Sequence, residues 1–130
     1  MDKPKKVLLI EDDQMVVRLY KRKLTMDGFD LLLAFNGEEG LEVLEKEIPD
    51  IILLDIMMPK LNGLATLERI KADSRFKNIP VVILTNLGDR SDDVERCKKM
   101  GAEDYWVKVN INIETLTDNI NQILARHAQQ

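Results

Sequence analysis

The stretch Ile51–Gly63 has the sequence IILLDIMMPKLNG, four apolar residues followed by an acid, a proline and a turn dipeptide. An uninterrupted apolar run indicates a strand buried on both faces, because a half-exposed strand alternates polar with apolar side chains. Asp55 directly follows this run, at the strand end where open α/β sheets bind ligands. Pro59 and Asn62-Gly63 predict a loop, and then a helix beginning near Leu64. Asp55 is therefore a candidate site residue, the alternative being an acid that only ends a strand or caps a helix.

Short apolar runs and amphipathic stretches alternate along the rest of the chain. The apolar runs predict strands at residues 5–10, 29–35, 51–54, 81–84 and 105–107. Between them, apolar residues recur at spacings of three and four, which is the pattern of helices with one apolar face. The predicted helices lie before Gly28, over residues 37–47, after Leu64, over about 91–100 and from Ile113 onward.

The apolar residues of each helix identify the face that should pack on the sheet. In the first two helices these residues are Val16, Leu19, Tyr20 and Leu24, then Leu41, Leu44 and Ile48. The helix at about 91–100 offers only Val94, Cys97 and Met100 as an apolar stripe. We therefore expect that helix to be the least firmly held.

Five strands alternating with five helices predict an α/β fold with one parallel sheet, because the short connections allow only right-handed crossovers. We expect a flavodoxin-like, doubly wound (βα)5 sandwich of three layers with strand order 2-1-3-4-5. In this order the first and third strands are neighbours. The acids of Glu11–Asp13 should then meet Asp55 at one edge of the sheet, where Thr85 and Lys108 also follow strands.

Composition limits the classes of protein to which the chain can belong. Its 130 residues, 45% hydrophobic and 32% charged, are typical of one soluble globular domain. A net charge of −4 and a pI near 5.1 argue against a nucleic-acid-binding surface. Cys97 is the only cysteine, and no signal peptide or apolar run long enough for a membrane span is present. We expect a cytoplasmic protein that does not bind membranes.

The carboxylates predicted to meet at the strand ends need nearby positive charge. Two unit charges about 4 Å apart repel by roughly 4 kcal/mol at an effective dielectric constant near 20. Oxygen ligands without His or Cys favour a hard cation, and Mg²⁺ suits a shallow site. Lys108 can supply further positive charge. A cation, a lysine and a hydroxyl around one carboxylate are what phosphoryl transfer requires, which makes Asp55 the predicted nucleophile.

Four motifs stand in order at the ends of predicted strands: VLLIEDD, LLDIMMP followed by NG, VVILTN and GAEDYWVK. Together they resemble the receiver domain of two-component response regulators, in the chemotaxis-regulator-like superfamily. The resemblance covers essentially the whole chain and implies a single receiver domain over residues 1–130.

The resemblance also assigns a role to each acid of the predicted site. It implies that Asp55 is the phosphoacceptor and that Asp12 is a direct Mg²⁺ ligand. Glu11 would hold the ion mainly through water, and the main-chain carbonyl of Met57 would be the third protein ligand. We expect Asp13 to cap the first helix.

Three further residues match the family's switch. The resemblance implies that Thr85 hydrogen-bonds the phosphoryl group, that Lys108 pairs with it, and that Tyr105 is the switch aromatic. Phosphorylation adds a charge of roughly −1.5 to −2. Thr85 would then move toward the phosphoryl group, and Tyr105 would turn into the space beneath the helix at about 91–100. The surface of that helix, the last strand and the last helix is the implied face for partner docking or phosphorylation-dependent dimerisation.

The chain departs from the family's pattern at three positions. Val109 stands where proline usually follows the lysine. A cis peptide before a non-proline residue costs about 2.5–4 kcal/mol, so we predict that Lys108–Val109 is trans. Asn86 is larger than the small residue usual after the threonine, and would narrow access to the acceptor or hydrogen-bond the phosphoryl group. Glu11 replaces the commoner aspartate, which the family tolerates.

The sequence therefore predicts a phosphorylation-controlled signalling module whose donor is a sensor histidine kinase or a histidine phosphotransfer protein. It would catalyse its own phosphotransfer and slow dephosphorylation, without being an enzyme that turns over a separate substrate. One alternative is a pseudo-receiver that serves only as a protein-binding module. Another is a Mg²⁺-dependent phosphohydrolase with an aspartate nucleophile, which would need a second acid at position 57, where this chain has Met.

Overall fold

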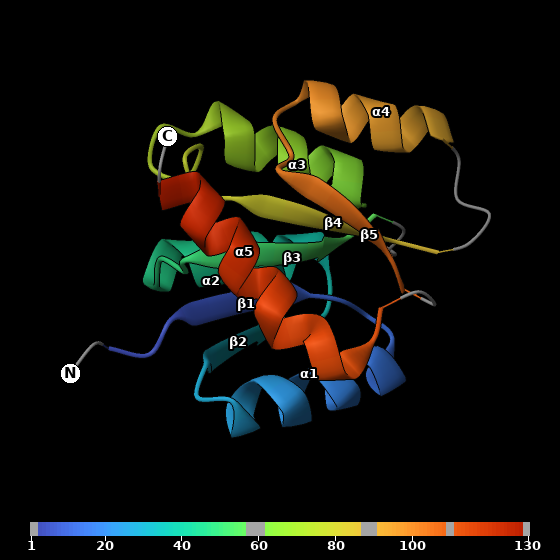
Figure 1. The fold of residues 1–130 in the computed structure, drawn as a ribbon. Helices are drawn as coiled ribbons and strands as arrows, with labels where there is room; N and C mark the ends of the chain where they lie inside the picture. The colour runs from blue at the N-terminus through green and yellow to red at the C-terminus, as the bar shows by residue number, and fades with distance from the viewer. Residues whose placement is uncertain (1–2, 57–61, 87–90, 109–110, 129–130) are drawn as a thin grey trace.

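Strands and helices alternate throughout the part of the chain that the computed structural model describes, residues 3–56, 62–86, 91–108 and 111–128 (Figure 1). The strands are β1 (Lys6–Ile10), β2 (Asp30–Ala34), β3 (Ile51–Asp55), β4 (Val81–Thr85) and β5 (Asp104–Val107). The helices are α1 (Gln14–Met26), α2 (Gly37–Lys46), α3 (Gly63–Ala72), α4 (Ser91–Lys99) and α5 (Leu116–Ala128). A short 3-10 helix, η2 (Ile113–Thr115), precedes α5.

All five strands form one parallel sheet in the order β2-β1-β3-β4-β5, which confirms the predicted flavodoxin-like topology. β1 lies between β2 and β3, with Leu8 in register with Leu32 on one side and Ile52 on the other. The chain adds β2 on one side of β1, and then adds β3, β4 and β5 in turn on the other side. The ends of β1 and β3 are consequently neighbours, although they are far apart in the sequence.

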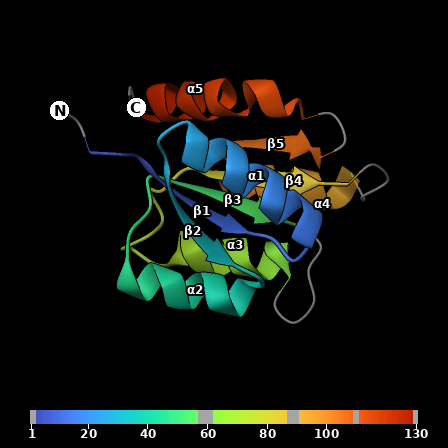
Figure 2. The same ribbon diagram turned by 90° about the horizontal axis from the view of Figure 1, so that it is seen from below.

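Helices cover both faces of the sheet because the central strands are apolar on both faces (Figure 2). On one face, strand residues such as Leu8, Ile52 and Ile83 pack with residues of α2, α3 and α4. On the other face, Leu9 and Leu53 pack with residues of α1 and α5. The two apolar layers hold the sheet rigidly and leave the strand ends to carry the polar residues.

The helices that follow the site loops begin at side chains suited to capping. Asp13 caps α1 as predicted, since its Oδ1 accepts hydrogen bonds from the amides of Met15 at 2.9 Å and Val16 at 3.4 Å. Asn62 caps α3 by accepting from the amide of Ala65 at 2.9 Å. Such caps satisfy amides that lack a partner within the helix, and they fix where the preceding loop ends.

Two apolar residues that we expected in the core are exposed. Leu19 of α1 is 54% exposed, because the buried side of this helix runs through Val17, Tyr20 and Leu24. Ile48 is 52% exposed, because α2 ends at Lys46 and the chain is extended before it reaches Ile48. The prediction extended the helical spacing past the true end of α2.

The structure places the start of the last helix later than predicted, and it shows little burial along α4. The predicted last helix begins later than expected, since Ile113 belongs to η2 and α5 starts at Leu116. In α4, Cys97 is the one fully buried side chain among residues 92–99.

Among the described residues, no helix combines the length and the apolar character that crossing a bilayer would require.

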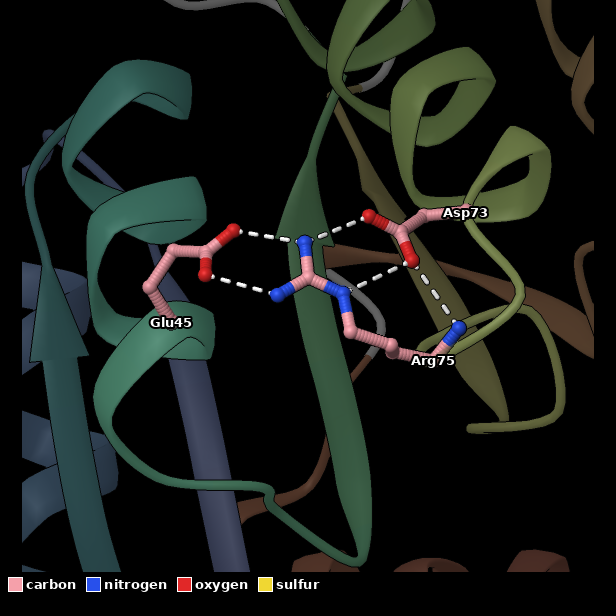
Figure 3. A network of polar contacts seen from close by, with 3 residues as sticks. All are labelled: Glu45, Asp73 and Arg75. Carbon is pink, nitrogen blue, oxygen red and sulfur yellow. Dashed lines mark hydrogen bonds and ion pairs between the residues drawn. The ribbon is translucent and has the colours of Figure 1, made fainter.

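A polar network joins α2 to the end of α3 (Figure 3). The Arg75 guanidinium donates to both carboxylate oxygens of Glu45 at 2.7 Å, and also to both oxygens of Asp73. Both helices run back from the edge of the sheet where β1 and β3 end. The network therefore lies at the end of the fold opposite the polar strand tips, where it links the C-terminal ends of α2 and α3.

Candidate functional site

Three carboxylates from two neighbouring strand ends form a compact acidic cluster. Carboxylate oxygens of Glu11, Asp12 and Asp55 lie within 4.8 Å of one another. Glu11 and Asp12 follow β1, while Asp55 is the last residue of β3. Glu11 and Asp55 are 0% and 1% exposed, whereas Asp12 is exposed. Two of the acids are therefore removed from water, and the third faces it.

Lys108, at the end of β5, places its ammonium group between the two buried acids. Its Nζ lies 2.7 Å from Glu11 Oε1 and 3.2 Å from Asp55 Oδ2, and the lysine side chain is only 9% exposed. Burial alone lowers the pKa of Lys108, but the bond to Glu11 and the charges of Asp55 and Glu11 outweigh that effect, so the pKa is raised. The lysine is a permanent cation that offsets part of the carboxylate charge.

Glu11 is held in place by an ion pair and two hydrogen bonds. Besides the ion pair between Oε1 and Lys108, its Oε2 accepts a hydrogen bond from the amide of Asp13 at 3.0 Å. Its own amide donates to the carbonyl of Ala34 at 2.9 Å, which continues the pairing of β1 with β2. Glu11 is thus a fixed, buried anion, while Asp12 beside it is exposed and has a carboxylate oxygen within 4.8 Å of the other two acids.

The donor atoms of the cluster suit a hard divalent cation. Glu11, Asp12 and Asp55 offer only carboxylate oxygen, the ligand type that Mg²⁺ prefers. The single ammonium group of Lys108 balances one of three negative charges, so the site as a whole still attracts positive charge. The residues present therefore fit Mg²⁺. The carbonyl of Met57, predicted as a further ligand, lies outside the described residues.

Thr85 and Tyr105, predicted to act as a switch, occupy two adjacent strands on the same side of the acidic cluster. Thr85 ends β4 and is 2% exposed, and its hydroxyl donates a long hydrogen bond of 3.4 Å to the carbonyl of Trp106. Tyr105 lies in β5 and is 38% exposed. The side chain of Thr85 is therefore linked to Tyr105 through the backbone of Trp106, the next residue in β5.

Gly63 is a site residue that sequence reasoning did not single out as one. Its amide donates to the carbonyl of Ile56 at 3.0 Å. A Cβ placed on Gly63 would overlap the carbonyl oxygen of Asp55 and lie 2.5 Å from the Cα of Ile56. The start of α3 therefore packs directly on the backbone of the acidic residue. Only the turn dipeptide Asn62-Gly63 signalled this contact in the sequence.

Two further predictions concerned Asn86 and Val109, the residues that follow Thr85 and Lys108. Asn86 follows Thr85 and is exposed. Val109 lies outside the described residues, so the prediction of a trans Lys108–Val109 peptide stays a prediction.

Comparison with known proteins gives a family match over most of the chain. A family model described as the response regulator receiver domain matches residues 7–121. The transcriptional regulatory protein CpxR of Escherichia coli (strain K12) is 39% identical over 121 residues, which are 93% of this chain and 50% of that protein. The chain spans about half the length of the curated relatives it matches: 50% of CpxR and 41% of a probable transcriptional regulator, ycf27, of Guillardia theta.

Solved structures match the fold over nearly the full chain. The receiver domain of the Francisella response regulator 1452 has a TM-score of 0.82 and 32% identity, covering 94% of this chain and 98% of that one. The Mn²⁺-bound form of response regulator Rcp1 has a TM-score of 0.75 and 28% identity, covering 94% of this chain and 91% of that one.

Proposed function

From the premise that this chain belongs to the family of response regulator receiver domains of two-component signalling, we propose that it is switched by phosphorylation of Asp55. The donor is a histidine kinase or a histidine phosphotransfer protein. The observation that carries the proposal is the buried carboxylate of Asp55, which lies 3.2 Å from Lys108 and within the acidic cluster with Glu11 and Asp12.

The chemistry uses Asp55 as the nucleophile. A carboxylate oxygen of Asp55 attacks the phosphorus of a phosphohistidine, the P–N bond breaks, and the leaving imidazole of the donor keeps the electron pair and takes up a proton from water. An acyl phosphate forms on Asp55. Lys108 remains within reach of Asp55 and neutralises charge on the phosphoryl oxygens, which is the largest requirement of phosphoryl transfer.

The residues that would hold Mg²⁺ are Asp12, Asp55 and, through water, Glu11. When bound, the ion supplies charge compensation for the phosphoryl oxygens. The chain's own residues orient the nucleophile, since Gly63 packs on the Asp55 backbone and Lys108 pairs with its carboxylate. Hydrolysis of the acyl phosphate by the same site is slow, and the protein turns over no separate substrate.

Phosphorylation is transmitted through Thr85. Among the described residues, the hydroxyl of Thr85 makes one long bond, to the carbonyl of Trp106, so a phosphoryl oxygen on Asp55 is a better acceptor. When Thr85 turns toward it, Tyr105 is freed to turn inward beneath α4. The face of α4, β5 and α5 then changes shape and binds a partner or a second copy of the chain.

A docking face for the phosphodonor lies on α1, directly after the acidic cluster. Met15, Leu19 and Met26 form a stripe on this helix and are 73%, 54% and 74% exposed. Exposed apolar stripes bordered by charged residues mark protein interaction sites. Arg18 and Arg22 border this one, and its first residue is two positions after Asp13. A helix of the donor protein packing here would bring its phosphohistidine to Asp55.

Mass spectrometry of the intact protein tests the proposed acceptor. Incubation with Mg²⁺ and acetyl phosphate should add one phosphate, stable to acid and labile to base, to the wild type and to Asp118→Asn. Asp118 is an exposed residue of α5 and serves as the matched control. Asp55→Asn should take up none. No adduct on the wild type would favour a pseudo-receiver, and repeated turnover of acetyl phosphate would favour a hydrolase.

A further inference from the structure

The ring of Tyr105 lies against a lysine of the neighbouring helix. Lys98 Nζ of α4 is 4.5 Å from the centroid of the Tyr105 ring. β5 is an edge strand of the sheet, and Tyr105 is 38% exposed there. A lysine within about 6 Å of the face of a tyrosine ring is attracted by the negative charge of that face. The contact stabilises the ring in its partly exposed position.

Tyr105 is closely connected to Thr85 through the pairing of β4 with β5. Ile83 is in register with Tyr105, and Thr85 with Val107. The Thr85 hydroxyl donates to the carbonyl of Trp106, the residue after Tyr105. A change in the position of Thr85 therefore affects a hydrogen bond to the backbone that directly follows Tyr105.

The helix that carries Lys98 has little buried surface of its own. Cys97 is its one fully buried side chain among residues 92–99, so little apolar burial fixes α4. Lys98 is an exposed residue, and its contact with Tyr105 ties α4 to the edge strand. An inward turn of Tyr105 would carry its ring away from this contact with Lys98.

We propose that Lys98 is a positioning residue for Tyr105. Its cation holds the ring in the partly exposed position while Asp55 is unphosphorylated, and so opposes the inward turn. This inference rests on the proposed function, because the inward turn is the response to phosphorylation. Cation–π contacts at exposed sites change an equilibrium by about two- to fivefold, which is enough to alter the balance of a switch whose states are close in energy.

The first experiment measures the contact itself in the unphosphorylated protein, without a divalent cation. The chain has two tyrosines, Tyr20 and Tyr105, so NMR of protein with ¹³C-labelled tyrosine rings gives few signals. Lys98→Met should shift the Tyr105 ring signal, and Lys98→Arg should retain it near the wild-type position. Lys99→Met, a change at the adjacent exposed lysine, should leave it in place. Tyr20, which is buried, is the internal reference.

The second experiment measures the effect on the switch with beryllofluoride, a phosphoryl mimic, in the presence of Mg²⁺. Lys98→Met should bind beryllofluoride about two- to fivefold more tightly than the wild type, because the ring turns inward more readily. Lys98→Arg and Lys99→Met should bind as the wild type does. With Tyr105→Leu as the background, Lys98→Met should have no further effect, because the ring is gone.

The outcomes separate this inference from the function on which it rests. An unchanged Tyr105 signal in Lys98→Met would overturn the inference. So would tighter binding that persists in the Tyr105→Leu background, since Lys98 would then act without the ring. A wild type that does not bind beryllofluoride would overturn both the proposed function and the coupling to it, whereas equal binding by the wild type and Lys98→Met would overturn the inference alone.

Discussion

Lys108 is closer to Glu11 than to Asp55: its Nζ lies 2.7 Å from Glu11 Oε1 and 3.2 Å from Asp55 Oδ2. The lysine therefore neutralises the fixed acid of the cluster as well as the acceptor. A divalent cation bound by the same acids would share this task. Lys108 and the cation are alternative sources of positive charge for Glu11, and this relation can be measured.

Lys108→Met should destabilise the metal-free protein, because it leaves buried Glu11 without its ion-pair partner. Removal of one partner of a buried ion pair typically costs about 3–5 kcal/mol in the free energy of unfolding. Mg²⁺ should restore more stability to this variant than to the wild type, because the ion replaces the missing charge. Urea denaturation with EDTA or with Mg²⁺ measures both effects.

Lys5→Met is the control for this comparison, since Lys5 is exposed and far from the cluster. It should leave both the unfolding free energy and the gain from Mg²⁺ at wild-type values. An equal gain from Mg²⁺ in Lys108→Met and the wild type would show that the ion and the lysine do not share the charge of Glu11.

Gly63→Ala should abolish phosphorylation by acetyl phosphate, because its Cβ would overlap the carbonyl oxygen of Asp55. Relief of the overlap requires the start of α3 or the acceptor backbone to move. Overpacking of this kind costs about 1–3 kcal/mol of stability. Intact-mass measurement of phosphate uptake and thermal unfolding together check the prediction.

Gly28→Ala is the control that separates the loss of stability in Gly63→Ala from its loss of phosphate uptake. Gly28 has a φ of 89°, which strains an alanine, but a Cβ there has nothing within 4 Å. We expect this control to lose stability and to retain phosphate uptake. Normal uptake in Gly63→Ala would contradict the role we give to the close backbone contact.

The sequence predicted the sheet order and the meeting of Glu11, Asp12 and Asp55, because both depend on where strands end. Asp13, expected beside them, caps α1 instead of joining the cluster. Glu11 and Asp55 each directly follow or end a fully apolar run, which fixes their place in a parallel sheet. The exposure of Leu19 was not predictable from spacing alone, since Val17 offered a competing apolar face on the same helix. The contact between Gly63 and the Asp55 backbone arises from a tertiary approach, and a glycine in a turn gave only a weak signal of it.

Cys97 should react slowly with thiol reagents in the native protein. Burial, and then the nearby charge of Asp93, raise the pKa of the thiol to about 11. The reactive thiolate is therefore scarce at pH 8, and the side chain is only 1% exposed. We expect a rate with Ellman's reagent at least about 100-fold below that of the protein in urea. The rate should rise with pH as the pH approaches 11.

The raised pKa of Cys97 also predicts the direction of a pH effect on stability. A folded-state pKa above the unfolded value means that the unfolded chain loses its proton first. The contribution of Cys97 to stability is therefore complete below about pH 8.5 and is lost as the pH rises toward 11. Cys97→Ala should show a smaller decline of unfolding free energy over this range. An equal decline in both proteins would contradict the shift.

Leu19→Glu should slow phosphotransfer from a phosphorylated histidine phosphotransfer protein by about tenfold, as expected for a central apolar contact of an interface. Leu19 is 54% exposed on α1, so the substitution leaves the core intact. Acetyl phosphate needs no docking surface and should phosphorylate the variant at the wild-type rate. Ile48→Glu is a matched control, because Ile48 is 52% exposed at the opposite end of the sheet and should affect neither reaction. Equal slowing of both reactions by Leu19→Glu would mean that the change disturbs the acidic cluster, and equal slowing by both variants would mean that charge alone weakens the encounter.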